Sequence, residues 1–227
     1  MERFDHNTYP ISEREKKGAE ISFRAATESM VLLRNDNEVL PLAEKETIAL
    51  YGVGAARTVR GGTGSGDPFN GGLSGGGSAD VNQSTRYHIN VFDSFKRLGF
   101  TVVNEELHVK NGERYDRLSR EEETNHMSVF ACPEEALTDA EVKGDAAKAD
   151  TAVFILSRNS GEGSDRNLTG KNAKGEETGD YRLSASEKAN ISLIRANFKK
   201  LVIVLNVGSQ VDMTEINALN PDSVLLM

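Results

Sequence analysis

Apolar residues follow two different periods along this chain. Short runs of consecutive apolar residues, typical of strands buried on both faces, alternate with stretches in which apolar residues recur every three or four positions, as in amphipathic helices. The runs predict strands at residues 47–53, 100–103, 151–157, 200–207 and 223–227. The other stretches predict helices from Ser12 towards Leu33, over 89–98, from Thr138 to about 148 and from Ser184 to about 198. Such alternation predicts an α/β fold: a three-layer α/β/α sandwich with a mostly parallel sheet, flavodoxin-like in outline.

The starts of three helices are indicated by capping boxes. In this motif a Ser or Thr side chain accepts a hydrogen bond from the backbone N–H three residues later. The Glu side chain at that later position accepts in turn from the backbone N–H of the Ser or Thr. The pairs are Ser12 with Glu15, Thr138 with Glu141, and Ser184 with Glu187. We interpret residues 1–24 as a lead-in followed by helix, and residues 1–227 as a single domain.

Two segments interrupt the alternation. Residues Gly61–Gly77 are rich in glycine and too long for a plain strand-to-helix turn, and loops of that length are often functional. Residues 105–136 form a charged insertion that is helical in part, and their charge pattern favours a solvated surface excursion.

Composition excludes several classes of partner. The net charge is −8, from 35 acidic and 27 basic residues, which argues against nucleic acid or an anionic membrane as a partner. The single cysteine, Cys132, excludes an internal disulfide framework and fits a reducing compartment. No apolar run approaches the length of a transmembrane helix, and the first residues lack the apolar core of a signal peptide. If Met1 is the native start, we expect a cytoplasmic protein.

The sequence gives little support for a nucleotide, metal or cofactor site. Gly52-Val-Gly54-Ala-Ala-Arg57 begins like a dinucleotide fingerprint, but Arg57 stands where the third glycine is needed. Metal-ligand spacing is absent among the four histidines and between them and the cysteine: His6, His88, His108, His126 and Cys132. We therefore expect neither a metal nor a cofactor.

The loop after the strand at 151–157 is the strongest candidate for chemistry. Its sequence is Ser160-Gly-Glu-Gly-Ser-Asp-Arg166, with Glu162 between two glycines that permit a sharp turn and close approach of a ligand. Ligands of open α/β sheets bind at the carboxyl ends of strands, and a glutamate there can act as a general acid or base. Glycoside hydrolysis needs two carboxylates, but Glu162 and Asp165 on one loop need not face opposite sides of a sugar. Judged by these residues alone, Glu162 can equally be structural, with Asp165 and Arg166 as an ion pair that braces the loop.

Five blocks of this chain, in order, resemble the α/β sandwich domain of glycoside hydrolase family 3, the family of many β-glucosidases. They are spread over about 190 residues: Ala25–Leu42, Ile48–Gly54, Gly61–Asp67, Ala152–Arg166 and Leu201–Met213. The stretch 105–136 carries little of the resemblance.

The resemblance implies a retaining β-glycosidase that hydrolyses terminal non-reducing β-linked sugars. It makes Glu162 the general acid/base and places the loop of Gly64 and Ser65 beside the sugar. It adds Asp165 and Arg166 as residues that shape the site and contact substrate. The expected substrate is an oligosaccharide or β-glucoside.

The same resemblance implies a partner domain. The family's aspartate nucleophile lies on a TIM barrel, a domain of about 250 residues that this chain lacks. The chain is then expected to be inactive without the barrel. Two alternatives remain: a non-catalytic carbohydrate-binding or scaffold module of the same fold, and a flavodoxin-like nucleotide or signalling domain, which does not explain the Glu162 loop.

Overall fold

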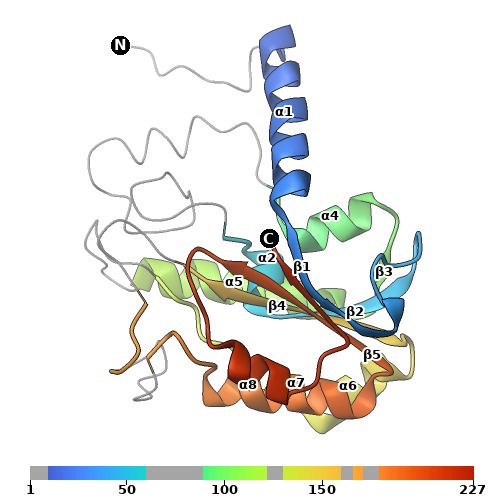
Figure 1. The fold of residues 1–227 in the computed structure, drawn as a ribbon, viewed down its shortest axis with the longest axis vertical. Helices are drawn as coiled ribbons and strands as arrows, with labels where there is room; N and C mark the ends of the chain where they lie inside the picture. The colour runs from blue at the N-terminus through green and yellow to red at the C-terminus, as the bar shows by residue number, and fades with distance from the viewer. Residues whose placement is uncertain (1–9, 60–88, 122–129, 160–165, 171–178) are drawn as a thin grey trace.

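The computed structural model describes residues 10–59, 89–121, 130–159, 166–170 and 179–227, and its centre is a six-stranded sheet (Figure 1). The strands lie in the order β1-β6-β5-β4-β2-β3. β1 is antiparallel to β6, and every other neighbouring pair is parallel, so the mostly parallel sheet is confirmed. The strands are β1 Val31–Asn35, β2 Thr47–Tyr51, β3 Thr101–Val102, β4 Thr151–Arg158, β5 Lys200–Val207 and β6 Ser223–Leu226.

Helices cover both faces of the sheet, which confirms the predicted three-layer sandwich. The layer of α6, α7 and α8 lies below the sheet in Figure 1, and α4 lies on the opposite face. α5 packs against the short helix α2 that follows β2. The helices of the described residues are α1 Glu13–Ser29, the 3₁₀ turn η2 Asp36–Glu38, α2 Val53–Ala56, α4 Val91–Arg97, α5 Glu105–Glu121, α6 Asp139–Ala146, α7 Ala185–Asn197 and α8 Met213–Ala218.

β4 runs through the middle of the sheet and is buried on both faces. Phe154 and Leu156 belong to the core under α6, α7 and α8, whereas Val153 and Ile155 belong to the core on the opposite face. This alternation follows from the two-residue period of a strand. A continuous apolar run is therefore what a central parallel strand requires.

All three predicted capping boxes are present. The side chains of Ser12, Thr138 and Ser184 each accept from the backbone N–H three residues later, and the glutamate at that position accepts from the cap residue's N–H. These bonds satisfy N–H groups that have no partner within a helix, and so they define where α1, α6 and α7 begin.

The expectation that the first helix runs towards Leu33 is wrong at its end. α1 ends at Ser29, and Val31–Asn35 form β1, which pairs with β6 (Val31 opposite Leu226). A local pattern cannot reveal a strand partner almost two hundred residues away. The helix α8 was also not predicted from the sequence, since it is only six residues long.

The interpretation of residues 105–136 as a solvated excursion is wrong for α5. His108 and Asn111 on this helix are 2% and 6% exposed, and the His108 ring stacks on Phe92 of α4 with ring centroids 4.7 Å apart. The charged residues of α5 conceal a buried face. α5 is thus part of the packed domain.

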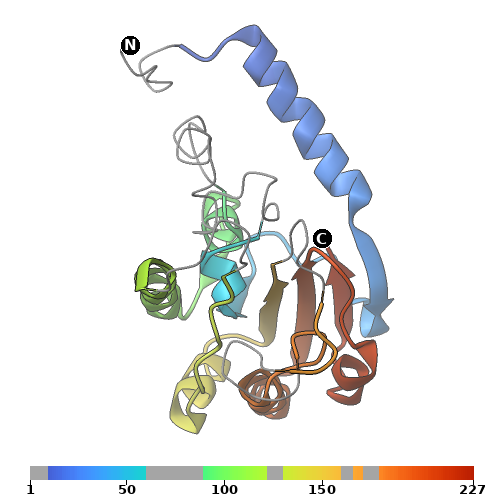
Figure 2. The same ribbon diagram turned by 90° about the vertical axis from the view of Figure 1, so that its left-hand side faces the viewer.

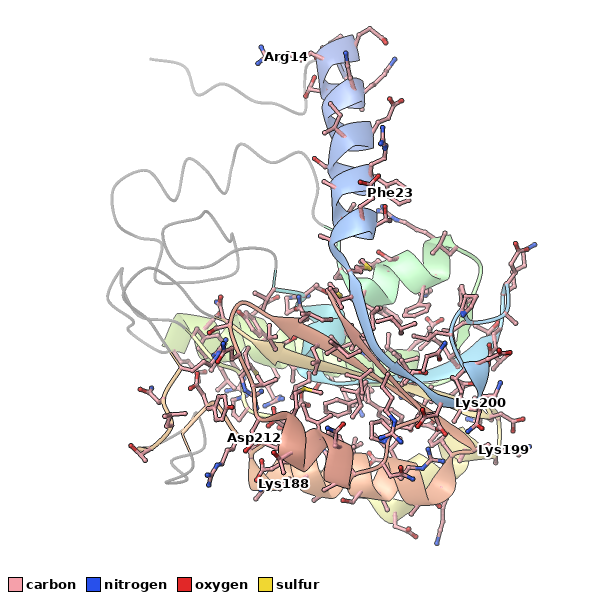
Figure 3. The ribbon with its side chains drawn as sticks, viewed as in Figure 1. Arg14, Phe23, Lys188, Lys199, Lys200 and Asp212 are labelled. Carbon is pink, nitrogen blue, oxygen red and sulfur yellow. The ribbon has the colours of Figure 1, made fainter. Side chains whose placement is uncertain are left out.

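α1 projects away from the sheet (Figures 1 and 2). None of its residues is buried, and Phe23, labelled in Figure 3, is 70% exposed. Nowhere in the described ranges is a helix both long and apolar enough to cross a membrane.

The two glycines after β2 have a packing reason. Gly52 has φ of +91°, and a Cβ there would lie 2.3 Å from the backbone oxygen of Ile155 on β4. A Cβ on Gly54 would lie 1.8 Å from the Ser157 hydroxyl. Arg57, in place of a third glycine, donates from Nε to Oδ1 of Asp116 on α5 (2.8 Å). Close approach to β4 accounts for both glycines without a nucleotide.

Gly52→Ala should therefore lower the free energy of unfolding by about 3 kcal/mol, from positive-φ strain and overlap with backbone. Gly144→Ala is the matched control, because Gly144 lies inside α6 with nothing within 4 Å of a new Cβ. That control should raise the free energy of unfolding by about 0.5–1 kcal/mol, because alanine favours a helix interior more than glycine does. Urea unfolding of both variants measures the difference. Equal effects of the two substitutions would refute the close approach of Gly52, in the turn after β2, to the backbone of β4.

Candidate active site

The candidate site lies where the strand order reverses. From β2 the chain crosses to β3 on one side, and the next strand, β4, lies on the other side of β2. The carboxyl ends of β2 and β4 therefore flank a topological switch point, the usual ligand site of open α/β sheets. The Glu162 loop directly follows β4, and the glycine-rich segment follows Val59, shortly after β2 and α2.

Most predicted site residues fall outside the described part of the chain. These are Glu162, Asp165, Gly64 and Ser65, whose roles remain predictions. Arg166 is described, and its side chain is only 7% exposed. The residues that support both loops at their ends are also described.

At the end of β4, the Arg158 guanidinium is buried and fully bonded. Nη1 and Nη2 donate to the two carboxylate oxygens of Glu187 (2.6 and 2.7 Å), and Nε donates to the backbone oxygen of Asp180 (2.9 Å). The remaining N–H groups donate to the backbone oxygens of Ser157 and Arg182. Burial alone would lower the Arg158 pKa, but the Glu187 carboxylate raises it. Arg158 thus stays charged and joins β4 to the start of α7.

After the loop, Arg166 is held by the same segment. Its Nη1 donates to Oδ2 of Asp180 (2.6 Å), and Oδ1 of Asp180 accepts from the Asn167 N–H (2.6 Å). Burial lowers the Arg166 pKa. The predicted ion pair with Asp165 is untested, because Asp165 lies outside the described residues. Residues 158 and 166, on either side of the loop, are therefore both fastened to Asp180.

Two polar atoms of Arg166 are buried and have no partner among the described residues. Its Nε and Nη2 make no hydrogen bond to this part of the chain, and the same is true of both amide atoms of Asn159. Buried polar groups are normally bonded, so unsatisfied ones are candidates for binding a ligand. These two side chains flank the Glu162 loop, which is compatible with the predicted role of Arg166 in substrate binding.

The chain just before the glycine-rich segment is anchored by the end of β5. The Asn206 side chain accepts from the Val59 N–H (2.7 Å) and donates to the Val59 carbonyl (2.9 Å). The Ser157 hydroxyl of β4 donates to the same Asn206 oxygen (3.2 Å). One amide therefore connects the ends of β4 and β5 to the residue before the segment.

A second carboxylate lies at the end of β2. Glu134 accepts from the Val53 N–H through Oε1 (2.7 Å), and burial raises its pKa to about 7 despite that bond. The nearby Glu187 raises it further, and Arg114 and Arg158 lower it. Its charge state therefore changes near neutral pH.

The sequence reading missed four residues that support the site: Asn206, Arg158, Glu134 and Asp180. The partners bonded by their side chains include residues 13 to 147 positions away, which no local pattern reveals. Glu187 was found only as part of a capping box. Only Arg158 had a usable signal in the sequence, because it directly follows the predicted buried strand at residues 151–157.

No group of three or more potential metal ligands gathers in the parts of the chain that the structure describes. The bonded groups of the site are guanidinium, amide and carboxylate. Groups of these three kinds hydrogen-bond hydroxyl groups, and of the three only a carboxylate transfers a proton near neutral pH.

The glycosyl hydrolase family 3 C-terminal domain model matches residues 30–227. The chain is 33% identical over 215 residues to beta-glucosidase A of Butyrivibrio fibrisolvens, covering 88% of this chain and 24% of that protein. It is similar in structure to beta-glucosidase 3B of Thermotoga neapolitana in complex with glucose. That match has a TM-score of 0.71 and 33% identity, over 93% of this chain and 27% of that one.

A third similar protein is a beta-glucosidase from Paenibacillus barengoltzii, with a TM-score of 0.68 and 26% identity. This match spans 92% of the present chain and 21% of the Paenibacillus protein. The chain thus spans about a quarter of the length of these relatives.

The raised pKa of Glu134 predicts a pH-dependent stability. Between pH 4.5, its ordinary value, and about 7, the unfolded chain releases this proton while the folded chain keeps it. The Glu134 contribution to stability is therefore lost as pH rises through this window. Glu134→Gln keeps an acceptor for Val53 but removes the titration. The difference in free energy of unfolding between this variant and wild type should therefore shift in favour of the variant by about 2 kcal/mol between pH 4.5 and pH 7.

Glu135→Gln is the control, because that neighbouring side chain is 71% exposed. Urea unfolding at several pH values measures both variants. A Glu134→Gln curve that stays parallel to wild type would contradict the raised pKa.

Proposed function

Because the chain belongs to glycosyl hydrolase family 3 as its C-terminal domain, we propose that it is the acid/base-bearing domain of a retaining β-glycosidase. Its substrates are terminal non-reducing β-linked sugars of oligosaccharides or β-glucosides. Glu162 is the general acid/base. The observation that carries the proposal is the position of the Ser-Gly-Glu-Gly sequence directly after β4, beside the switch point, between the buried residues Arg158 and Arg166.

The mechanism is a double displacement. Protonated Glu162 donates its proton to the glycosidic oxygen while an aspartate of a barrel domain attacks the anomeric carbon and the leaving group departs. The Glu162 carboxylate then removes a proton from the water that attacks the same carbon, and the aspartate is released. Configuration is retained because the carbon is inverted twice.

In this proposal, Arg158 and Arg166 hold the two ends of the Glu162 loop in place. Arg158 fixes the start of the Glu162 loop, and Arg166 fixes its end on Asp180. Gly64, Ser65, Asp165 and Arg166 contact the sugar. A chain with this half of the site and no nucleophile hydrolyses nothing by itself.

Glu162→Ala is the direct test, in an enzyme that contains this chain and a barrel domain. Substrates with poor leaving groups need protonation most, so their turnover should fall by roughly 10²–10⁴-fold. Activated aryl glucosides should lose less, and azide should restore turnover by taking the place of the activated water.

Glu121→Ala, which removes a half-exposed carboxylate at the end of α5, is the matched control and should leave turnover unchanged. Steady-state rates with paired good and poor leaving groups measure the effect. Full activity of Glu162→Ala on cellobiose-like substrates would refute the assignment. It would favour a non-catalytic sugar-binding module of the same fold.

A further inference from the structure

The Asn206 amide replaces a missing strand partner for Val59. Asn206 is 5% exposed at the end of β5, and its side chain bonds both backbone groups of Val59, accepting from the N–H (2.7 Å) and donating to the carbonyl (2.9 Å). Paired bonds of this kind to one residue are how neighbouring strands hold each other. Val59 is the last described residue before the segment that carries Gly64 and Ser65.

The same amide is tied to β4. Ser157 donates its hydroxyl to Oδ1 of Asn206 (3.2 Å), three residues before the Glu162 loop begins. That hydroxyl occupies the space that a Cβ on Gly54 of α2 would need, so α2, β4 and β5 meet at this junction. Movement of Val59 relative to β4 would break at least one of these bonds.

The start of α4 is held by the residue next to Val59. The Thr58 hydroxyl donates to the Gly54 carbonyl (2.9 Å) and accepts from the Val91 N–H (2.9 Å) at the start of α4. The described residues before and after the stretch 60–88 are therefore connected through Thr58 to the turn that packs on β4.

We propose that Asn206 is a positioning residue for glycoside hydrolysis: it fixes Val59, which leads into the segment of Gly64 and Ser65, relative to Ser157, which leads into the Glu162 loop. The inference rests on the proposed function. Asn206 acts through Val59 and Ser157 and does not touch the substrate. Small errors in the placement of contacting groups are costly, since about 1 Å can change a rate by roughly 10²-fold.

Asn206→Asp tests the role with minimal change of shape. It keeps the acceptor for Val59 and Ser157 but replaces the donor with an oxygen that faces the Val59 carbonyl. Asn104→Asp is a matched control. The Asn104 amide, just after β3, bonds the N–H and carbonyl of Leu50 in the same way (3.1 and 2.9 Å) but holds neither loop.

The experiment compares both variants in an enzyme that contains this chain and a barrel domain, at a temperature where thermal unfolding shows both to be folded. The readouts are kcat/KM for a β-glucoside and the inhibition constant of glucose, which reports sugar binding alone. For Asn206→Asp we expect about a tenfold loss in kcat/KM and about a tenfold rise in the inhibition constant. For Asn104→Asp we expect less than about a twofold change in either.

Ser157→Ala is a milder variant if Asn206→Asp does not fold. It removes one bond of the junction and should raise the inhibition constant of glucose by about threefold. An inhibition constant that stays at the wild-type value, with Glu162→Ala inactive, overturns the role of Asn206 and leaves the proposed function intact. Full activity of Glu162→Ala overturns both.

Discussion

The parallel pairing of β4 with β2 and β5 is the constraint on which the rest of the domain depends. Phe154 lies between Tyr51 of β2 and Ile203 of β5, so the three strands run to the same edge of the sheet. β4 continues to Arg158, whereas β2 ends at the residue opposite Phe154. The four extra residues extend β4 by about 13 Å beyond β2.

That difference in length explains the glycines and the anchors. The turn after β2 fills the place beside the end of β4 that a strand would otherwise occupy, and Gly52 and Gly54 let it approach the β4 backbone. With no strand continuing there, side chains supply the missing bonds: Glu134 to Val53, and Asn206 to Val59. The same edge then carries both loops of the proposed site.

The Arg158–Glu187 pair has a geometric role more than an energetic one. Buried ion pairs often contribute little net stability compared with apolar residues, but they are costly to break. All five N–H donors of Arg158 are used, on acceptors from β4, α7 and residues 180–182. A group bonded in five directions cannot move independently, and it immediately precedes the residues that lead to Glu162.

The sequence allowed the layers to be predicted because they depend on local patterns. The apolar run at residues 151–157 and the capping box at Ser184 are signals within a few residues, and both elements were predicted with bounds close to those observed. β1 and the buried face of α5 were missed because their partners are distant in sequence. Glu162 was predicted from its motif, whereas Asn206 has no motif and its partner Val59 is 147 residues away.

Affinity labelling of the acid/base group would test the assignment of Glu162 most directly. In an enzyme that contains this chain and a barrel domain, a β-glucosylamine carrying an N-bromoacetyl group places a reactive carbon where the leaving-group oxygen normally lies. The acid/base carboxylate displaces bromide and forms an ester, which peptide mass spectrometry locates. We expect the label on Glu162, and protection by glucose. A label on any other carboxylate, Asp165 included, would contradict the assignment.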